Sequence, residues 1–254
     1  MSDTPTDPAE LIRRAGKSEL PKRFFKLASA EPADGGFVVK LDGRAIKTPG
    51  RKPLAVGSAA VAEALAAEWN ALGEHIDPGR LPLTRIANAA IDRVAEAMPA
   101  VRDEVLKYAG SDLICYRAAD PPSLVEAQEA QWGPLVAFAR EALGARLVLA
   151  EGIVHVPQDA VALAAIERAL APFDPLELAA VSTITSITGS AVMALALAHG
   201  AIDPDDAWQA AFVDEDWQAE RWGEDAIAMA RRAAQRKEFD AAAVILRGGS
   251  RGRA

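Results

Sequence analysis

The sequence holds a single cysteine, Cys115, among its 254 residues. One cysteine excludes a disulfide within the chain and a zinc site built from several cysteines. Cys115 stands in the apolar run DLICYR, which predicts a small buried hydrophobic side chain. The chain also has only three histidines, His75, His155 and His199, and their spacing fits no metal-binding helix motif. We therefore expect no metal site and no cofactor.

The sequence also lacks the motifs of common catalytic sites. It contains no GxxxxGK[ST] or GxGxxG phosphate-binding loop and no GxSxG nucleophile turn. An acidic cluster comprises Asp214, Glu215, Asp216, Glu224 and Asp225. Consecutive residues of a helix point about 100° apart, so the first three carboxylates cannot share one cation. We expect a solvated acidic rim and no catalytic residue.

The 28 basic residues are outnumbered by 36 acidic ones, so the net charge is -8 and the pI is about 5.0. An acidic chain without a clustered basic stripe argues against nucleic acid and against an anionic membrane surface as the main partner. The N-terminal segment MSDTPTDPAE has neither the apolar run of a signal peptide nor the basic character of a transit peptide. The expected location is therefore the cytoplasm.

One uncharged stretch, Leu178 to Ala198, is long enough to cross a bilayer. Its hydroxyl side chains and Gly189 lower its hydrophobicity. Pro175 before it and Gly200 after it are the start and stop signals of a helix in a water-soluble protein. We therefore expect a helix buried inside a helical domain and no stable membrane insertion.

Apolar periodicity divides the chain into a β-rich first third and a helical remainder. The strands are expected at residues 22–28, 37–41, 44–48 and 54–56, with Asp42-Gly43 as a hairpin turn. The helices of the first half are expected at residues 58–73, 81–94 and 101–108.

The best boundary is the segment from Ala118 to Pro122, since the two consecutive prolines break a helix and stiffen a linker. Ser123 and Glu126 form a capping-box pattern for a helix to Leu143, with a kink at Pro134. Two short strands are expected at residues 146–150 and 153–156, and further helices at residues 159–170, 175–199, 203–226 and 226–246.

The fold class is therefore α+β, with a small β-containing N-terminal domain that also has helices, followed by a mainly helical C-terminal domain. The expected limits are a flexible tail over residues 1–18, the N-terminal domain over 19–119, the helical domain over 120–247 and a second tail over 248–254.

The segment from Asp203 to Ala226 is the strongest candidate for an interaction helix. Asp203 and Pro204 form a helix start. When the residues are projected around a helix axis at 100° per residue, one face contains a single carboxylate among apolar side chains. We call this face the stripe. A charge in such a stripe is either paired in the interior or faces a partner, and both interpretations stay open. The stripe comprises Trp208, Phe212, Glu215, Ala219, Trp222 and Ala226.

Two further groups of residues contain more polar side chains than a solvent-exposed surface requires. Arg85, Asn88 and Asp92 share a helix face by their spacing. A second group follows in KYAGSDLICYR, with Tyr108, Asp112, Tyr116 and Arg117. The two interpretations are a polar network that joins the two parts of the protein and a ligand pocket at their junction.

Seven motifs, taken in order, resemble those of the assembly-chaperone family for F-type ATP synthase. The resemblance covers residues 22–246, and one departure is Gly133, where the family tends to have an aspartate between Trp132 and Pro134. The motifs are GGFVVKLDGRAIKTP, LPLTRIANAAIDRV, SDLICYRA, QEAQWGPL, GIVHVPQ, TGSAVMALALAHG and DEDWQAERWGED.

The resemblance implies a monomeric chaperone that binds the unassembled α subunit of the enzyme's catalytic head, with related eukaryotic proteins in the mitochondrial matrix. An exposed subunit interface aggregates unless it is shielded. The alternatives are an enzyme with a pocket at the domain junction and a general holdase. The residues expected to bind the partner are Trp208, Phe212, Glu215, Asp216, Trp217 and Trp222.

Overall fold

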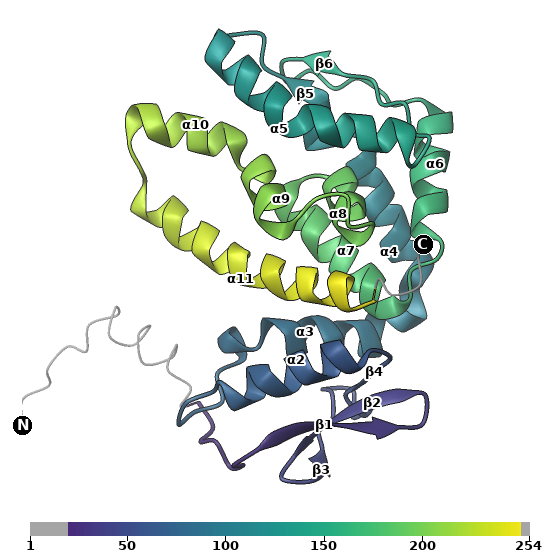
Figure 1. Cartoon of the computed structure of the whole chain (residues 1–254), viewed down its shortest axis with the longest axis vertical. Coiled ribbons are helices and arrows are strands. Elements are labelled where there is room, and N and C mark those ends of the chain that lie inside the picture. The colour runs from purple at the N-terminus through teal and green to yellow at the C-terminus, as the bar shows by residue number, and fades with distance from the viewer. Residues whose placement is uncertain (1–19, 250–254) are drawn as a thin grey trace, which may run out of the picture.

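The computed structural model describes residues 20–249. A small sheet occupies the lower end of the molecule (Figure 1). Helices α2, Ala59–Asn70, and α3, Pro82–Ala89, lie above it, and the helices of the second half form the upper part. This arrangement confirms the α+β class. The tail expected over residues 1–18 lies outside the described residues, as do residues 250–254.

The sheet is antiparallel and is built around β2, Gly36–Leu41. Strand β1, Ala28–Ala33, pairs along its length, and β3, Arg44–Ala45, follows the turn at Asp42-Gly43. The short β4, Ala55–Val56, pairs with the start of β2. The strand expected at residues 22–28 is wrong, since it begins only at Ala28, and the one expected at 44–48 ends at Ala45.

Strand β1 is an edge strand whose outer side is partly closed. The Asn70 side chain accepts a hydrogen bond from the Ala28 amide at 2.8 Å and donates to the Ala28 carbonyl at 2.9 Å. Backbone groups of a strand alternate in direction, so those of Ala30 and Pro32 face the same way as those of Ala28. Proline has no amide hydrogen to offer there.

A long helical run connects the two parts. Helix α2, Ala59–Asn70, is capped by Ser58 as expected. After η1, Pro78–Arg80, the chain is helical almost without interruption through α3, Pro82–Ala89, η2, Ala90–Val94, and α4, Ala95–Ala109, with a kink at Ala97 just before Pro99. Helix α4 packs against three helices of the second half, α6 (Ala160–Leu170), α7 (Pro175–Thr188) and α8 (Ala191–Ala198). The domain division near residues 118–122 therefore stays a prediction.

The upper part is almost entirely helical. Its only strands, within residues 20–249, are β5 and β6, which pair in parallel over two residues each. The two strands expected at residues 146–156 are therefore wrong except at Ala150. The elements are η3 Leu113–Cys115, β5 Tyr116–Arg117, α5 Pro122–Glu141, β6 Ala150–Glu151, α6 Ala160–Leu170, α7 Pro175–Thr188, α8 Ala191–Ala198, α9 Pro204–Ala211, α10 Val213–Trp222 and α11 Ala226–Gly249.

The uncharged stretch from Leu178 to Ala198 forms the centre of the core, as expected. Every residue of α8 is buried, and α7 buries most of its length. It is not one helix, however, because Gly189 takes a φ of 71° and ends α7, after which Ser190 caps α8. Among the described residues, no helix is long and apolar enough to cross a membrane.

The helix expected over residues 203–226 is also divided. Phe212 has a φ of -119°, which ends α9 and turns the chain into α10. Gly223, at a φ of 88°, ends α10 before α11 begins. The single stripe from Trp208 to Ala226 is therefore wrong, since its residues belong to three helices.

Candidate functional site

Helix α10 is held to the rest of the protein mainly by polar contacts. Val213 is its only buried residue. Ser123, which was expected to cap α5, instead accepts hydrogen bonds from Trp217 Nε1 at 3.2 Å and Arg221 Nη2 at 3.0 Å. The Arg221 guanidinium also stacks on the Trp217 ring, 3.7 Å from its centroid. Because the capping position of α5 is Pro121, the Ser123 hydroxyl is available for α10.

Arg232 of α11 fastens α10 from the other side. Both oxygens of the Asp216 carboxylate accept hydrogen bonds from its guanidinium, in a forked ion pair. The same guanidinium lies 4.6 Å from the centre of the Phe212 ring. Asp216 therefore joins α10 to α11, so its charge is largely neutralised within the protein.

Glu215, the residue before Asp216 on α10, is exposed. It lines a groove of about 590 Å³ between α10 and α11, together with Ala219 and Ile227. Partial desolvation in the groove raises the pKa of Glu215, and the neighbouring carboxylates act in the same direction. Within residues 20–249, no side chain donates a hydrogen bond to its carboxylate. Of the two interpretations of Glu215, the structure therefore does not support the buried, paired one.

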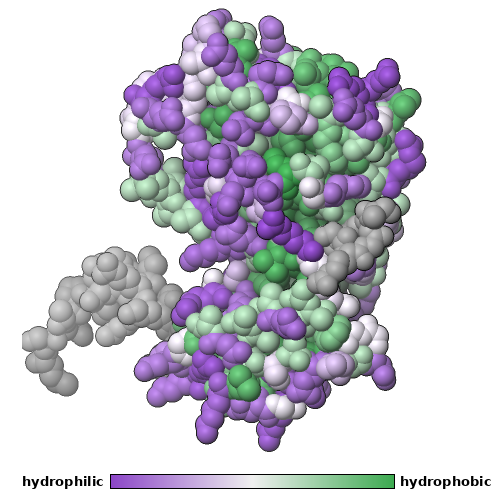
Figure 2. Space-filling model, viewed as in Figure 1, coloured by the Kyte–Doolittle hydropathy of each residue, from purple (hydrophilic) through white to green (hydrophobic). Residues whose placement is uncertain are grey.

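We call α10 together with residues 226–237 of α11 the arm. In Figure 1 the arm forms a hairpin at the left edge of the molecule. Trp222 is 74% exposed and Ile227 is 82% exposed, and Met229 is exposed as well. Hydrophilic side chains dominate the visible surface, with apolar ones showing between them (Figure 2). The arm thus offers apolar area next to the exposed carboxylate of Glu215.

The other aromatic residues expected to bind the partner lie differently. Trp208 and Phe212 are buried, and their rings pack 4.4 Å apart between centroids. Trp217 is half-buried against α5 and makes an edge contact with Trp222 at 5.7 Å. The structure thus brings Glu215 and Trp222 to the surface and leaves Trp208 and Phe212 in the core.

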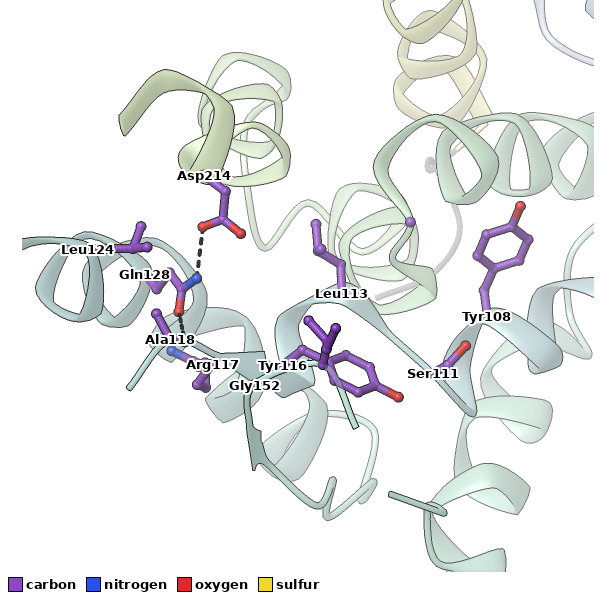
Figure 3. Close-up of a pocket in the computed structure, with 12 residues that line it drawn as sticks. Tyr108, Ser111, Leu113, Tyr116, Arg117, Ala118, Leu124, Gln128, Gly152 and Asp214 are labelled. Atoms are coloured by element: carbon purple, nitrogen blue, oxygen red, sulfur yellow. Dashed lines mark hydrogen bonds between the residues drawn. The ribbon is translucent and has the colours of Figure 1, made fainter. Parts of the chain in front are cut away.

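A second cavity, of about 590 Å³, lies on the α5 side of α10 (Figure 3). Its lining is mainly apolar and includes Leu113, Leu124 and Ile153. The Asp214 carboxylate accepts a hydrogen bond from Gln128 Nε2 at 2.8 Å, and Gln128 in turn accepts one from the Ala118 amide at 2.8 Å (Figure 3). Helix α10 therefore separates two cavities, with Asp214 at one and Glu215 at the other.

The six residues expected to form one junction network are distributed over several places. Tyr108 and Arg117 line the cavity of Figure 3, and Arg117 pairs with Glu129 at 3.1 Å. Tyr116, from the same motif, also lines it and is hydrogen bonded to His155 Nδ1 at 3.1 Å. These residues therefore do not form one continuous network in the structure, and part of the second group borders a pocket.

The other members of that network have structural contacts elsewhere. Arg85 forms an ion pair with Glu238 of α11, and the Asn88 side-chain oxygen is buried without a hydrogen-bond partner. Asp92 accepts hydrogen bonds from Thr48 Oγ1 at 2.7 Å and from the Gly50 amide at 2.8 Å, which fixes the turn after β3 to η2.

Asp112 is completely buried beneath the start of α8. Its carboxylate accepts hydrogen bonds from the Val192 amide at 3.1 Å and the Ile114 amide at 3.3 Å. Burial raises its pKa to about 6, although the hydrogen bonds act in the opposite direction. Nearby, burial raises the pKa of Cys115 to about 12, so this thiol behaves as the buried hydrophobic side chain that the sequence predicts.

Sequence analysis missed Ser123, Gln128 and Arg232, the three residues that position α10. Gln128 is a polar residue on the buried face of α5, which is a usable signal. Ser123 was assigned to a helix cap, and Arg232 depends on a hairpin that local periodicity does not reveal. Among the described residues, no group of histidine, cysteine and carboxylate side chains could hold a metal ion.

The sequence and the fold of this chain are both similar to those of known proteins. The profile of the family described as ATP12 chaperone protein matches residues 22–140. The mitochondrial protein atp12 of Schizosaccharomyces pombe is 25% identical over 214 residues, which are 80% of this chain and 74% of that protein.

Solved structures are more similar. A chaperone candidate from Agrobacterium tumefaciens has a TM-score of 0.86 and 42% identity, over 97% of this chain and 92% of that one. Atp12 from Paracoccus denitrificans has a TM-score of 0.83 and 38% identity, over 91% of this chain and 99% of that one. A point mutant of the same Paracoccus protein gives a TM-score of 0.82.

Proposed function

Since this chain belongs to the ATP12 chaperone family, we propose that it is an assembly chaperone for F-type ATP synthase that binds the unassembled α subunit. It shields the surface that the α subunit later buries against the β subunit. It acts as a monomer, without catalysis and without a cofactor. The enzyme and the general holdase are the alternatives that the experiments below distinguish.

The observation that best supports this function is the exposed Glu215 beside the apolar side chains of the arm. An unassembled subunit exposes apolar and charged surface, and a complementary surface must present both kinds of group. The arm with its loop, residues 213–237, contains six carboxylates and five basic side chains, but no side chain within residues 20–249 donates a hydrogen bond to Glu215. The client surface is therefore expected to be apolar with a basic group opposite Glu215.

The packing of α10 supports reversible binding. Helix α10 buries only Val213, so small adjustments of the arm cost little core packing. A binding surface that is not held rigidly gives a lower affinity, because ordering it costs free energy on binding. A lower affinity suits a client that must later be released. Release occurs when the β subunit competes for the same surface, because the sequence has no phosphate-binding loop with which to couple release to ATP hydrolysis.

The test is client protection. Purified α subunit, diluted from denaturant or warmed, is expected to scatter light through aggregation, and an equimolar amount of this protein is expected to suppress the scattering without nucleotide. Added β subunit is expected to displace the chaperone. Because arm charges contribute, complex formation should weaken as the salt concentration rises.

A pull-down from native lysate with mass spectrometry separates the alternatives. Enrichment of the ATP synthase α subunit supports the proposal, and many unrelated clients indicate a general holdase. If the α subunit is absent, or protection has an absolute requirement for ATP, the proposal is wrong.

A further inference from the structure

A second surface with the properties of a docking site lies at the opposite end of the molecule, on the sheet. A groove of about 590 Å³ runs between residues 24–25 and the β2–β3 hairpin. Its floor is apolar, formed by the buried side chains of Phe25, Leu41 and Trp69 and the partly buried Ile46. Figure 1 shows this sheet at the lower end, far from α10.

Large apolar side chains stand exposed at this groove. Phe24, which lines it, is 76% exposed, and Leu27, three residues further on, is 61% exposed. The Phe24 ring makes an edge contact with Phe25 at 5.7 Å, and Phe25 contacts Trp69 at 5.8 Å. The rings of Trp69, Phe25 and Phe24 therefore form a continuous row from the core to the surface, and the last of them, Phe24, is exposed to solvent.

The chain holds this exposed segment in place. Arg23 donates hydrogen bonds to the carbonyls of Phe25, Lys26, Asn70 and Leu72, at 2.6 to 3.2 Å. On the other side, the carboxylate of Asp42 accepts hydrogen bonds from the amides of residues 26 and 27 at 3.0 to 3.1 Å. Phe24 is therefore presented outward by a fixed backbone, and its exposure is not the result of a loose loop.

The charges around the groove are positive and unpaired. Arg44 and Lys47 line it and are exposed, and Lys26 adjoins it. Across residues 20–249, none of these three cations takes part in an ion pair. The one carboxylate in the lining, Asp42, is already satisfied by backbone amides. Residues 20–58 carry eight basic and three acidic side chains, in a chain whose net charge is -8.

We propose that this groove docks an acidic protein segment that carries a large apolar side chain. The apolar side chain packs against Phe24 and Ile46, while carboxylates on either side of it pair with Arg44 and Lys47. A concave groove accepts an inserted side chain, whereas a bilayer presents a flat surface, and the net charge of -8 repels anionic lipid. The surface shares no residue with the arm, so its test does not depend on α-subunit binding.

The experiment uses the whole chain and a fluorescent synthetic peptide in which aspartate and glutamate surround one phenylalanine. Binding is followed by fluorescence anisotropy, and the site is mapped from amide chemical shifts of the isotopically labelled protein. Shift changes are expected at residues 24–27 and 44–47. The double variant Arg44→Glu, Lys47→Glu should bind on the order of tenfold more weakly, and Phe24→Ser should also weaken binding.

The matched control is Arg146→Glu, Arg168→Glu, which makes the same charge change at exposed positions of the helical part. This control should bind the peptide like the unmodified protein. Three results would overturn the proposal: no binding of the acidic peptide, equal binding of a peptide with lysine in place of its acidic residues, or shift changes confined to the arm. Cosedimentation with anionic vesicles that Arg44→Glu, Lys47→Glu abolishes, without peptide binding, would assign the surface to a membrane instead.

Discussion

Glu215 differs from its neighbours on α10 because its carboxylate lacks a side-chain partner among the described residues. Glu215→Gln should therefore leave the melting temperature nearly unchanged and weaken α-subunit binding. Glu215→Lys should weaken it further, because it reverses the charge presented to the client. Melting temperature and binding are measured for each variant together.

The choice of control for Glu215 follows from the contacts of α10. Asp216 and Trp217 lie on other sides of the helix, but Asp216 pairs with Arg232 and Trp217 donates to Ser123. Changing either would displace the helix itself. Glu220 is exposed on the same helix, so Glu220→Gln is the better control. If Glu215→Gln lowers the melting temperature by several degrees and binding falls only in proportion, Glu215 has a structural role.

Asp112 leads to a prediction about stability. Asp112→Asn keeps the size of the side chain but replaces one acceptor with a donor that faces backbone amides. The variant should lose about 1–3 kcal/mol of unfolding free energy, because a buried donor is left unsatisfied. Chemical denaturation at neutral pH measures this loss.

The same residue gives a pH dependence of known sign. Burial raises the folded-state pKa of Asp112 to about 6, above its ordinary value of 3.8. A group with a raised pKa stabilises the fold when protonated, and this contribution is lost as the pH rises through 6. The stability difference between the unmodified protein and Asp112→Asn should therefore grow as the pH falls from 7 to 5. A difference that shrinks over this range would contradict the assignment.

At the scale of elements, Ser123 is the residue through which α5 holds α10. Ser123→Ala removes the acceptor for both Trp217 and Arg221, at a cost of about 0.5–1.5 kcal/mol for each hydrogen bond. Amide hydrogens of α10 should then exchange about tenfold faster, while those of α7 keep their protection. Hydrogen-exchange mass spectrometry provides the measurement.

An exposed serine of another helix provides the comparison for this prediction. Ser186→Ala alters α7 at an exposed position whose side chain makes no hydrogen bond within residues 20–249, and it should leave the exchange of α10 unchanged. Equal acceleration in both variants, or unchanged exchange in Ser123→Ala, would show that other contacts hold α10.

Sequence patterns predicted the helical elements better than their interruptions. The Asp42-Gly43 turn, the Ser58 cap and the buried stretch around α8 were all predictable from local chemistry. The break at Phe212 was not, because an aromatic residue is a normal member of an apolar stripe, and only the packing of Trp208 and Phe212 into the core determines it.

The first strand was predicted at residues 22–28, whereas β1 spans Ala28–Ala33, and the reason for this error is related. The sequence of β1, ASAEPA, has small residues and a proline, so it lacks the usual composition of a strand. It forms because it pairs along the whole of β2 and packs on α2. The candidate site follows the same rule. Glu215 could be identified from its own helix, whereas its neighbours Arg232 and Ile227 depend on how α10 and α11 fold against each other.

On the scale of the whole molecule, α11 ties the two parts together. It packs against α2 and α3 of the lower part and against α7 and α8 of the upper part. Near its end, the carbonyl of Gly248 accepts a hydrogen bond from Ser58 Oγ at 3.0 Å. A methyl group added at Gly248 would lie 2.6 Å from Val61 Cγ2, so glycine permits this approach.

This arrangement predicts that the two parts unfold as one unit. Leu65→Ala, which creates a cavity under α2, should cost about 2–5 kcal/mol. Amide protection should fall by a similar factor in α2 and in α7, as seen by hydrogen-exchange mass spectrometry. Glu63→Ala changes an exposed residue of the same helix and should affect neither. If protection falls in α2 alone, the two parts unfold separately.

The hydrogen bonds of Asn70 on the outer edge of β1 matter for an assembly chaperone, which must not itself associate through an open strand edge. An open strand edge is a template onto which a second chain can add, and repeated addition grows a fibre. Asn70 occupies both outward groups of Ala28, and Pro32 has no amide hydrogen to offer, so Ala30 alone keeps an outward amide on this edge. The larger of the two sheets within residues 20–249 thus offers few open backbone groups along β1, which disfavours the addition of a second chain at this edge.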